Sequence, residues 1–268
     1  MPKASQKSEK PDIRGFLIDI DGVLYVEKQV IEGAVETLNY LQREKIPFLL
    51  VTNTTRRSRY SLLTNLNRMG FKISLDQIFS APFAAAQWLK ANKATSICLF
   101  AQGDTYREFK DFRNTTHNPQ YVLIGDLGED LTYEMLNQAF RLLMDGSELV
   151  ALQKNRYWRR SSGLAIDSGA IVAGLEYAAH KEARIIGKPS PDFFEQAFET
   201  IGLPAQHLAI IGDDLEADID GGAAAGLFTI AVKTGKQAGR SPVPGDSTPN
   251  LWLDAIAALP AWLRENYS

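Results

Sequence analysis

Cysteine is nearly absent from this sequence, and histidine is scarce. The one cysteine, Cys98, lies in the apolar run SICLF, so no disulfide can form within the chain and a buried thiol is expected. We therefore expect a reducing, cytoplasmic location. The three histidines, His117, His180 and His207, have no metal-ligand spacing. This argues against a site built from histidine and cysteine, such as a zinc site.

The sequence also lacks an excess of basic charge and any long apolar run. Its 29 Lys and Arg against 32 Asp and Glu give a formal net charge of -3. Nucleic-acid and membrane-surface partners normally need a basic patch, so we expect neither. No segment approaches the ~18 apolar residues of a membrane span. A chain of 268 residues with 45% hydrophobic content can bury one large core or two ordinary ones.

An apolar stretch that ends in two acids organises the rest of the chain. Residues 15–25 have the sequence GFLIDIDGVLY, with Asp19 and Asp21 just before Gly22. An apolar strand that leads acids into a glycine turn is typical of the carboxyl edge of a parallel sheet. Two carboxylates so close repel each other and favour a cation between them. In isolation, however, such a stretch is more often only a strand end followed by an Asp-Gly turn.

The order of predicted elements places a second domain inside the first. A strand, a helix and a strand cover residues 15–51, and the alternation restarts near residue 82. We predict an α/β fold with a doubly wound, Rossmann-like parallel-sheet core and an inserted α/β cap. A flexible tail is expected at 1–12, the core at 13–81 and 184–268, and the cap at 82–183, with hinges near Ala81 and Ala183. A last helix is expected over 251–263, interrupted at Pro260.

Four predicted strand ends carry polar side chains that would converge on one crevice, where such sheets bind ligands. Carboxylates without histidine or cysteine suit Mg²⁺, which is usually completed by a substrate phosphate. A hydroxyl, an amide, a lysine and free helix amides suit the phosphoryl oxygens. We therefore interpret the crevice as a site for phosphoryl transfer. Its residues are Asp19, Asp21, Thr52, Asn53, Lys188, Asp213, Asp214 and Asp218.

Each of these groups also has an ordinary explanation. Thr52 and Asn53 fit a turn before a helix, and Lys188 fits a solvated loop charge. The acids of GDDLEAD fit the N-terminus of a helix, where Asp is favourable. Their joint occurrence, in this order and at strand ends, makes the ordinary explanations improbable.

In these motifs the sequence resembles the haloacid dehalogenase (HAD) superfamily of phosphatases. DIDG, VTN, the lysine of IIGKPSP and GDDLEAD occur in order, and the likeness covers nearly the whole chain. The insert between the second and third motifs is similar to that of subclass IIA, the branch of NagD and the 4-nitrophenyl phosphatases. The cap stretches NQAFRLLMDG and RYWRRSSGLAIDSG are closer to the phospholysine phosphohistidine inorganic pyrophosphate phosphatases and haloacid dehalogenase-like hydrolase domain-containing protein two. The resemblance implies an enzyme, a phosphoric monoester hydrolase.

The resemblance also implies a role for each core residue. Asp19 would be the nucleophile that forms an aspartyl-phosphate, and Asp21 would protonate the leaving group and then activate water. Mg²⁺ would be held by the Asp19 side chain, the Asp21 main-chain carbonyl and Asp213. Asp214 and Asp218 would lie behind these ligands, and Asp218 would orient Lys188 or metal-bound waters. The phosphoryl oxygens would be held by Thr52, Asn53 and Lys188. The animal relatives just described have serine at the position of Asp21, so ordinary phosphomonoester hydrolysis is expected here instead of their reactions.

Specificity is expected from the cap, because the core motifs contact only phosphate. The candidates are Asn155, Arg156, Tyr157 and Trp158, although a basic cap surface explains this run equally well. Arg56, close behind Thr52, could attract an anion, but a solvated helix face is the favoured interpretation. We expect a small phosphorylated metabolite as substrate, which the sequence does not name. The resemblance implies a homodimer that pairs through the cap.

Two rival functions would use the same aspartate. A non-catalytic phospho-receiver also places acids, a threonine and a lysine at sheet ends. The long insert and the second acid, Asp21, count against it. A phosphotransferase or mutase would instead pass the phosphoryl group from Asp19 to an acceptor other than water.

Overall fold

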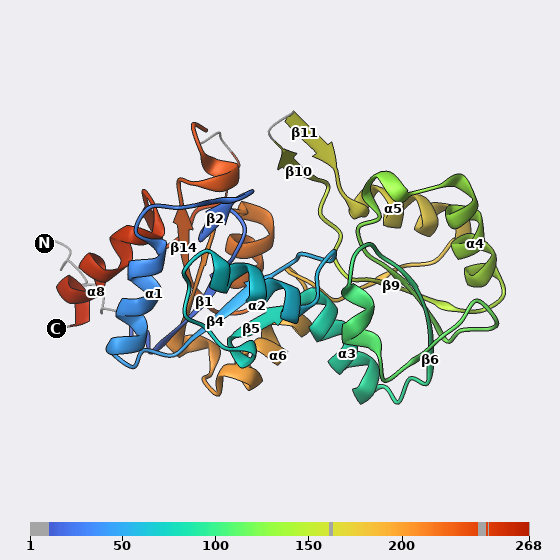
Figure 1. The fold of residues 1–268 in the computed structure, drawn as a ribbon, viewed down its shortest axis with the longest axis horizontal. Coiled ribbons are helices and arrows are strands. Elements are labelled where there is room, and N and C mark those ends of the chain that lie inside the picture. The colour runs from blue at the N-terminus through green and yellow to red at the C-terminus, as the bar shows by residue number, and fades with distance from the viewer. Residues whose placement is uncertain (1–10, 161–162, 241–244, 246, 268) are drawn as a thin grey trace, which may run out of the picture.

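Two parallel sheets, each covered by helices, organise the protein (Figure 1). The structure is a computed structural model that describes residues 11–160, 163–240, 245 and 247–267. Of the expected tail, residues 1–10 lie outside this part of the chain. Figure 1 shows the first sheet at the left and the second at the right, with the chain passing between them more than once. The expected α/β class with a doubly wound core is confirmed.

The core sheet has six strands, and every neighbouring pair is parallel. Its strands alternate their side chains between two buried clusters, so that Phe16 and Ile18 face one side and Leu17 the other. This burial on both faces explains why the strands have near-continuous apolar sequences. In spatial order they are β15 (Leu251–Leu253), β14 (Phe228–Val232), β13 (Leu208–Gly212), β1 (Gly15–Asp19), β4 (Phe48–Thr52) and β5 (Ile78–Ser80).

Helices cover both faces of this sheet because each has one apolar side. Leu38, Leu62 and Leu259 join the cluster on one face, and Phe193 and Phe194 join the cluster on the other. The core helices are α1 (Ala34–Arg43), α2 (Arg59–Arg68), α6 (Pro191–Ile201), α7 (Gly221–Ala224) and α8 (Leu259–Tyr267). None of the helices in the described part of the chain is long and apolar enough to cross a membrane.

The second sheet forms the cap and has five parallel strands. Two helices bury one of its faces in a cluster that contains Cys98, as expected for that thiol. The strands are, in spatial order, β12 (Arg184–Ile185), β9 (Glu148–Ala151), β8 (Tyr121–Ile124), β6 (Ser96–Phe100) and β7 (Arg113–Asn114). The helices are α3 (Ala81–Ala91), which leads from the core into the cap, α4 (Tyr133–Met144) and α5 (Ser168–Ala179).

Two antiparallel hairpins complete the fold. One consists of β2 (Tyr25–Val26) and β3 (Gln29–Val30) in the core, and the other of β10 (Tyr157–Arg160) and β11 (Gly163–Ile166) in the cap. Figure 1 shows both on the upper side of the molecule, with β10 and β11 rising between the two sheets. Neither hairpin was expected from the sequence.

Two predicted elements differ in the structure. The strand at the start of the expected second core segment, β12, pairs with β9 of the cap sheet, so the cap extends through Ile185. The expected helix over 251–263 is a strand, β15, followed by α8. Leu251 to Leu253 pair with β14, and this ladder decides their conformation. Pro260 lies in the first turn of α8, where a missing N–H costs nothing, so it begins a helix and does not interrupt one.

Hydrogen bonds attach the cap to the loop that follows β4. The Thr55 hydroxyl accepts from the Asp126 main-chain N–H at 2.8 Å, and the Thr105 hydroxyl donates to the Thr55 carbonyl at 2.6 Å. Ser58, which caps the N-terminus of α2, donates from its hydroxyl to Asp104 Oδ2 at 2.6 Å. The cap therefore contacts the core directly beside the end of β4.

Candidate active site

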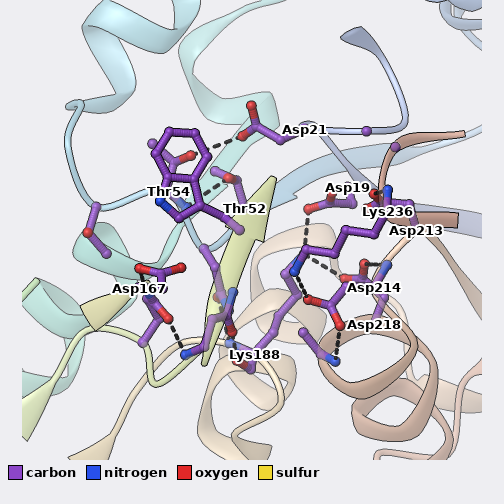
Figure 2. A pocket seen from close by; sticks show the side chains of 18 of the residues that line it. Asp19, Asp21, Thr52, Thr54, Asp167, Lys188, Asp213, Asp214, Asp218 and Lys236 are labelled. Carbon is purple, nitrogen blue, oxygen red and sulfur yellow. Dashed lines mark hydrogen bonds and ion pairs between the residues drawn. The ribbon is translucent and has the colours of Figure 1, made fainter. Parts of the chain in front are cut away.

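A cavity of about 620 Å³ lies between the carboxyl ends of the core strands and the cap (Figure 2). All eight core residues singled out in the sequence line it, because β1, β4 and β13 end at the same edge of the sheet. They are Asp19, Asp21, Thr52, Asn53, Lys188, Asp213, Asp214 and Asp218.

Lys188 is the centre of the polar network. Its Nζ lies 2.5 Å from Asp19 Oδ1 and 2.6 Å from Asp218 Oδ1, and all three side chains are buried. Burial opposes the charged form of the lysine, but the two carboxylates raise its pKa above the ordinary value. The ammonium therefore stays charged and holds both acids in place. Figure 2 shows these contacts as dashed lines from Lys188.

Asn53 positions Lys188 through the main chain. Its Oδ1 accepts from the Lys188 N–H at 2.8 Å, and its Nδ2 donates to the Lys188 carbonyl at 2.8 Å. Both polar ends of the amide are thus engaged. These contacts give Asn53 the task of orienting the lysine, and the expectation that it also holds phosphoryl oxygens stays a prediction.

Three carboxylates form a cluster that could hold a metal ion. One oxygen from each of Asp19, Asp213 and Asp218 lies within 4.8 Å of the others. Burial raises the pKa of Asp19 well above its ordinary value, raises that of Asp213 to about 7, and raises that of Asp218. Lys188 forms ion pairs with Asp19 and Asp218, whereas Asp213 forms none among the described side chains. The cluster therefore holds more carboxylates than ammonium groups in contact with it. A divalent cation with oxygen ligands fits this charge and this donor set.

Lys236 and Gln237 contact two of the acids, Asp214 and Asp213. Lys236 pairs with Asp214, which lowers the pKa of that carboxyl although burial opposes the shift. The Lys236 main-chain N–H donates to Asp213 Oδ2 at 2.6 Å, and Gln237 Nε2 donates to the Asp213 carbonyl at 2.9 Å. Asp213 is thereby held in one orientation. Sequence reasoning missed Lys236 and Gln237, which lie in a loop without a motif of its own.

Asp21 lies apart from the buried cluster. Its side chain is exposed to the cavity, and its Oδ2 accepts from the Thr54 hydroxyl at 3.0 Å. Gly22, which follows it, has a φ of 88°, and a Cβ there would lie 2.2 Å from Asp213 Oδ2. Only glycine therefore allows the turn after β1 to approach Asp213 so closely. The turn at Gly22 therefore lies against the buried Asp213, while Asp21 is exposed to the cavity.

Two of the four predicted cap residues reach the cavity. Asn155 and Trp158 line it, and Asn155 Oδ1 lies 3.4 Å from Asn53 Nδ2 of the core. Arg156 and Tyr157 are not among the described residues that line it. Arg156 is exposed and pairs with Glu216 at 3.4 Å, and the Tyr157 side chain is 50% exposed.

Arg56 is part of the cavity wall, although a solvated helix face was the favoured interpretation. Its Nε lies 2.7 Å from Asp126 Oδ2, and its guanidinium carbon lies 5.4 Å from the centre of the Trp158 ring. The sequence analysis also missed Asp126, Gln153 and Asp167. The first two follow cap strands β8 and β9, so the rule that ligands bind at carboxyl ends of parallel strands, applied to the cap, would have found them.

We expect Mg²⁺ to raise the midpoint of thermal unfolding, because it would bind the folded cluster and not the unfolded chain. Its affinity should fall as pH drops below about 7, where Asp213 takes up a proton in the metal-free site. Titration calorimetry in two buffers of different ionisation enthalpy would measure the affinity and the proton released. An affinity that stays constant through this pH range, with no proton released, would contradict the expectation. Asp145→Asn, on the exposed cap surface, is the matched control.

Comparisons with known proteins place the chain among HAD-like hydrolases. A haloacid dehalogenase-like hydrolase family matches residues 16–113, and a HAD-hydrolase-like family matches residues 185–259. Human haloacid dehalogenase-like hydrolase domain-containing protein 2 is 37% identical over 225 residues, which cover 84% of this chain and 85% of that protein. Human phospholysine phosphohistidine inorganic pyrophosphate phosphatase is 37% identical over 230 residues, covering 84% of each chain.

Solved structures of similar proteins have the same fold. A thermostable NPPase from Geobacillus stearothermophilus superposes with a TM-score of 0.83 at 27% identity, covering 92% of this chain and 98% of that one. NagD from Escherichia coli K-12 superposes with a TM-score of 0.81 at 25% identity, covering 91% and 97%. The likeness spans core and cap together, as the motif order predicted.

Proposed function

The chain belongs to the haloacid dehalogenase superfamily and is a phosphatase of its subclass IIA, and from this premise we propose its reaction. It hydrolyses a small phosphomonoester with the help of Mg²⁺ through an aspartyl-phosphate on Asp19. The observation that carries this proposal is the contact of Asp19 with Lys188 at 2.5 Å, beside two further buried acids and at the base of an open cavity.

The proposed first step uses Asp19 and Asp21. A carboxylate oxygen of Asp19 attacks phosphorus, the bond from phosphorus to the ester oxygen breaks, and Asp21 gives its proton to the leaving oxygen. In the second step water attacks phosphorus of the aspartyl-phosphate and Asp21 takes a proton from this water. The bond from phosphorus to the Asp19 oxygen breaks, which restores the carboxylate and releases inorganic phosphate. The exposed position of Asp21, fixed by Thr54, supports this double role.

Lys188 and Thr52 support the phosphoryl group in this proposal. The Thr52 oxygen accepts from the Thr54 main-chain N–H at 3.0 Å, so its O–H can donate to a phosphoryl oxygen. Mg²⁺, held by Asp19, Asp213 and the Asp21 main-chain carbonyl, would supply positive charge to the phosphoryl oxygens. Behind these ligands, Asp214 would hold Lys236 and Asp218 would hold Lys188.

The test is release of inorganic phosphate from 4-nitrophenyl phosphate, with and without Mg²⁺. We expect Mg²⁺-dependent turnover, and acid quenching should trap one phosphoryl group on the peptide that contains Asp19. Loss of the trapped species within seconds is expected of the enzyme. A phosphorylated form that persists for hours would favour the phospho-receiver instead. An alcohol that captures the phosphoryl group ahead of water would favour a phosphotransferase.

We propose a small phosphorylated metabolite as the natural substrate and the cytoplasm as the location, since Cys98 is the only cysteine. We also keep the proposal that two copies pair through the cap. Tyr133, Met144 and Tyr177, on α4 and α5, expose apolar surface there. Sedimentation of the full chain tests the pairing, and a monomer at all concentrations would contradict it.

A further inference from the structure

The side of the cavity formed by the cap is lined by a different set of polar and aromatic residues from the core side. Figure 2 shows Asp167 across the view from the buried acid cluster. Besides Asp167, the cavity is lined on this side by Asp126, Gln153, Asn155 and Trp158, together with Arg56 of the core. A substrate whose phosphoryl group meets Asp19 would place its leaving group toward these residues. They are therefore the groups that can distinguish one leaving group from another.

The charges on this side do not balance. Arg56 pairs with Asp126 at 2.7 Å, so these two cancel. Lys236, the other lysine that lines the cavity besides Lys188, pairs with Asp214. Asp167 forms no ion pair with a described side chain, although the charge of Lys236 acts to lower its pKa. Among the described side chains that line this part of the cavity, two acids, Asp126 and Asp167, therefore face one cation, Arg56.

Asp167 is built into the wall and has one oxygen to spare. Its side chain caps the N-terminus of α5, where Oδ1 accepts from the Ser168 N–H at 2.7 Å and from Gln153 Nε2 at 2.7 Å. The residue is only 8% exposed, yet it lines the cavity. Within the described part of the chain no donor contacts its Oδ2. Burial raises the pKa of this carboxyl because it disfavours the ionised form. A cation at Oδ2 would stabilise that ionised form.

We propose that Asp167 selects phosphomonoesters whose leaving group carries an ammonium group, which donates to Oδ2 beside the Trp158 ring. The inference rests on the proposed function, because it names the substrate class of the same site. An ammonium both fills the vacant acceptor and neutralises the charge. A hydroxyl fills the acceptor without neutralising it, and a carboxylate is repelled. The Trp158 ring, over which the Arg56 guanidinium carbon lies at 5.4 Å, adds apolar surface to the same wall.

The test uses three aryl phosphates that differ at the para position, with aminomethyl, hydroxymethyl and carboxylate groups. For the wild type we expect kcat/KM to be highest for the aminomethyl ester, about ten- to a hundredfold above the hydroxymethyl ester, and lowest for the carboxylate ester. The preference should appear mainly in KM. It should disappear at a pH high enough to deprotonate the substrate amine.

Asp167→Asn keeps the shape of the side chain and an oxygen for the Ser168 N–H, but it removes the charge. We expect the ratio of aminomethyl to hydroxymethyl kcat/KM to fall toward one. Asp167→Ser, which also caps a helix, guards against a folding defect of the first variant. Asp145→Asn, on the exposed end of α4, should keep the wild-type ratio.

The outcomes separate this inference from the proposed function. Turnover of all three esters with equal kcat/KM, or a ratio that is unchanged in both Asp167 variants, would overturn the role of Asp167 alone. No turnover of these esters or of 4-nitrophenyl phosphate would overturn the proposed function, and this inference with it.

Discussion

Asp19→Asn is expected to lower kcat on 4-nitrophenyl phosphate by about 10⁴-fold or more, the range found when a covalent nucleophile is removed. The amide has no anionic oxygen to attack phosphorus, and it withdraws one carboxylate from the cluster with Asp213 and Asp218. The loss should appear in kcat at saturating substrate. Stopped-flow absorbance of 4-nitrophenol, with Mg²⁺ present, measures it.

The control for Asp19→Asn is a demonstration that the variant is still folded. Because burial already raises the pKa of Asp19 well above the ordinary value, a neutral side chain suits this position, and the variant should unfold cooperatively. No phosphoryl group should be trapped on it after acid quenching. Turnover within tenfold of the wild type from the folded variant would sink the nucleophile assignment and move the phospho-receiver interpretation forward.

Lys188→Met is expected to destabilise the folded protein by about 3–5 kcal/mol at neutral pH, the usual cost of removing one partner of a buried ion pair. The ammonium lies 2.5 Å from Asp19 and 2.6 Å from Asp218, and the Lys188 side chain is 2% exposed. Without it, two buried carboxylates face each other with no cation between them. The variant should also lose most of its turnover, because we propose that this lysine supports the phosphoryl group.

The pH dependence follows from the same contacts. The carboxylates of Asp19 and Asp218 have raised pKa values in the folded protein, so protonation favours the folded state, and the defect should shrink as pH falls. Urea unfolding at several pH values measures this. Lys233→Met is the matched control, since Lys233 forms an exposed pair with Asp254 worth about 0–1 kcal/mol. Equal losses of stability in Lys188→Met and Lys233→Met would contradict the stabilising role of Lys188.

The residues of the site were predictable where a local pattern carried them. Asp19, Thr52 and Asp213 each follow or end a short apolar strand, and parallel strands bring their carboxyl ends to one edge. The motif order then predicted the insert and the family. Strand β15 was missed because LWL is too short to distinguish a strand from a helix by period, and its pairing with β14 decided the matter.

The side chains that complete the site were beyond local patterns. Asn53 contacts Lys188 across 135 residues of sequence, and Lys188 contacts Asp19 across 169. The sequence favoured a solvated position for Arg56, but in the structure it contacts Asp126 and Trp158 of the cap. No periodicity encodes such contacts, because the first two join distant segments of the core and the third joins the core to the cap.

The sequence by itself determined the fold class, the cap insertion and the identity of the core acids. These follow from alternation, turn chemistry and motif order, which act over a few residues at a time. Only the tertiary structure decided that Asn53 orients Lys188, that Lys236 pairs with Asp214, and that Asp167 lines the cavity with one oxygen that no donor contacts among the described residues. The physical reason is that charge balance and hydrogen-bond satisfaction belong to the assembled cavity, where every partner competes for the same few atoms.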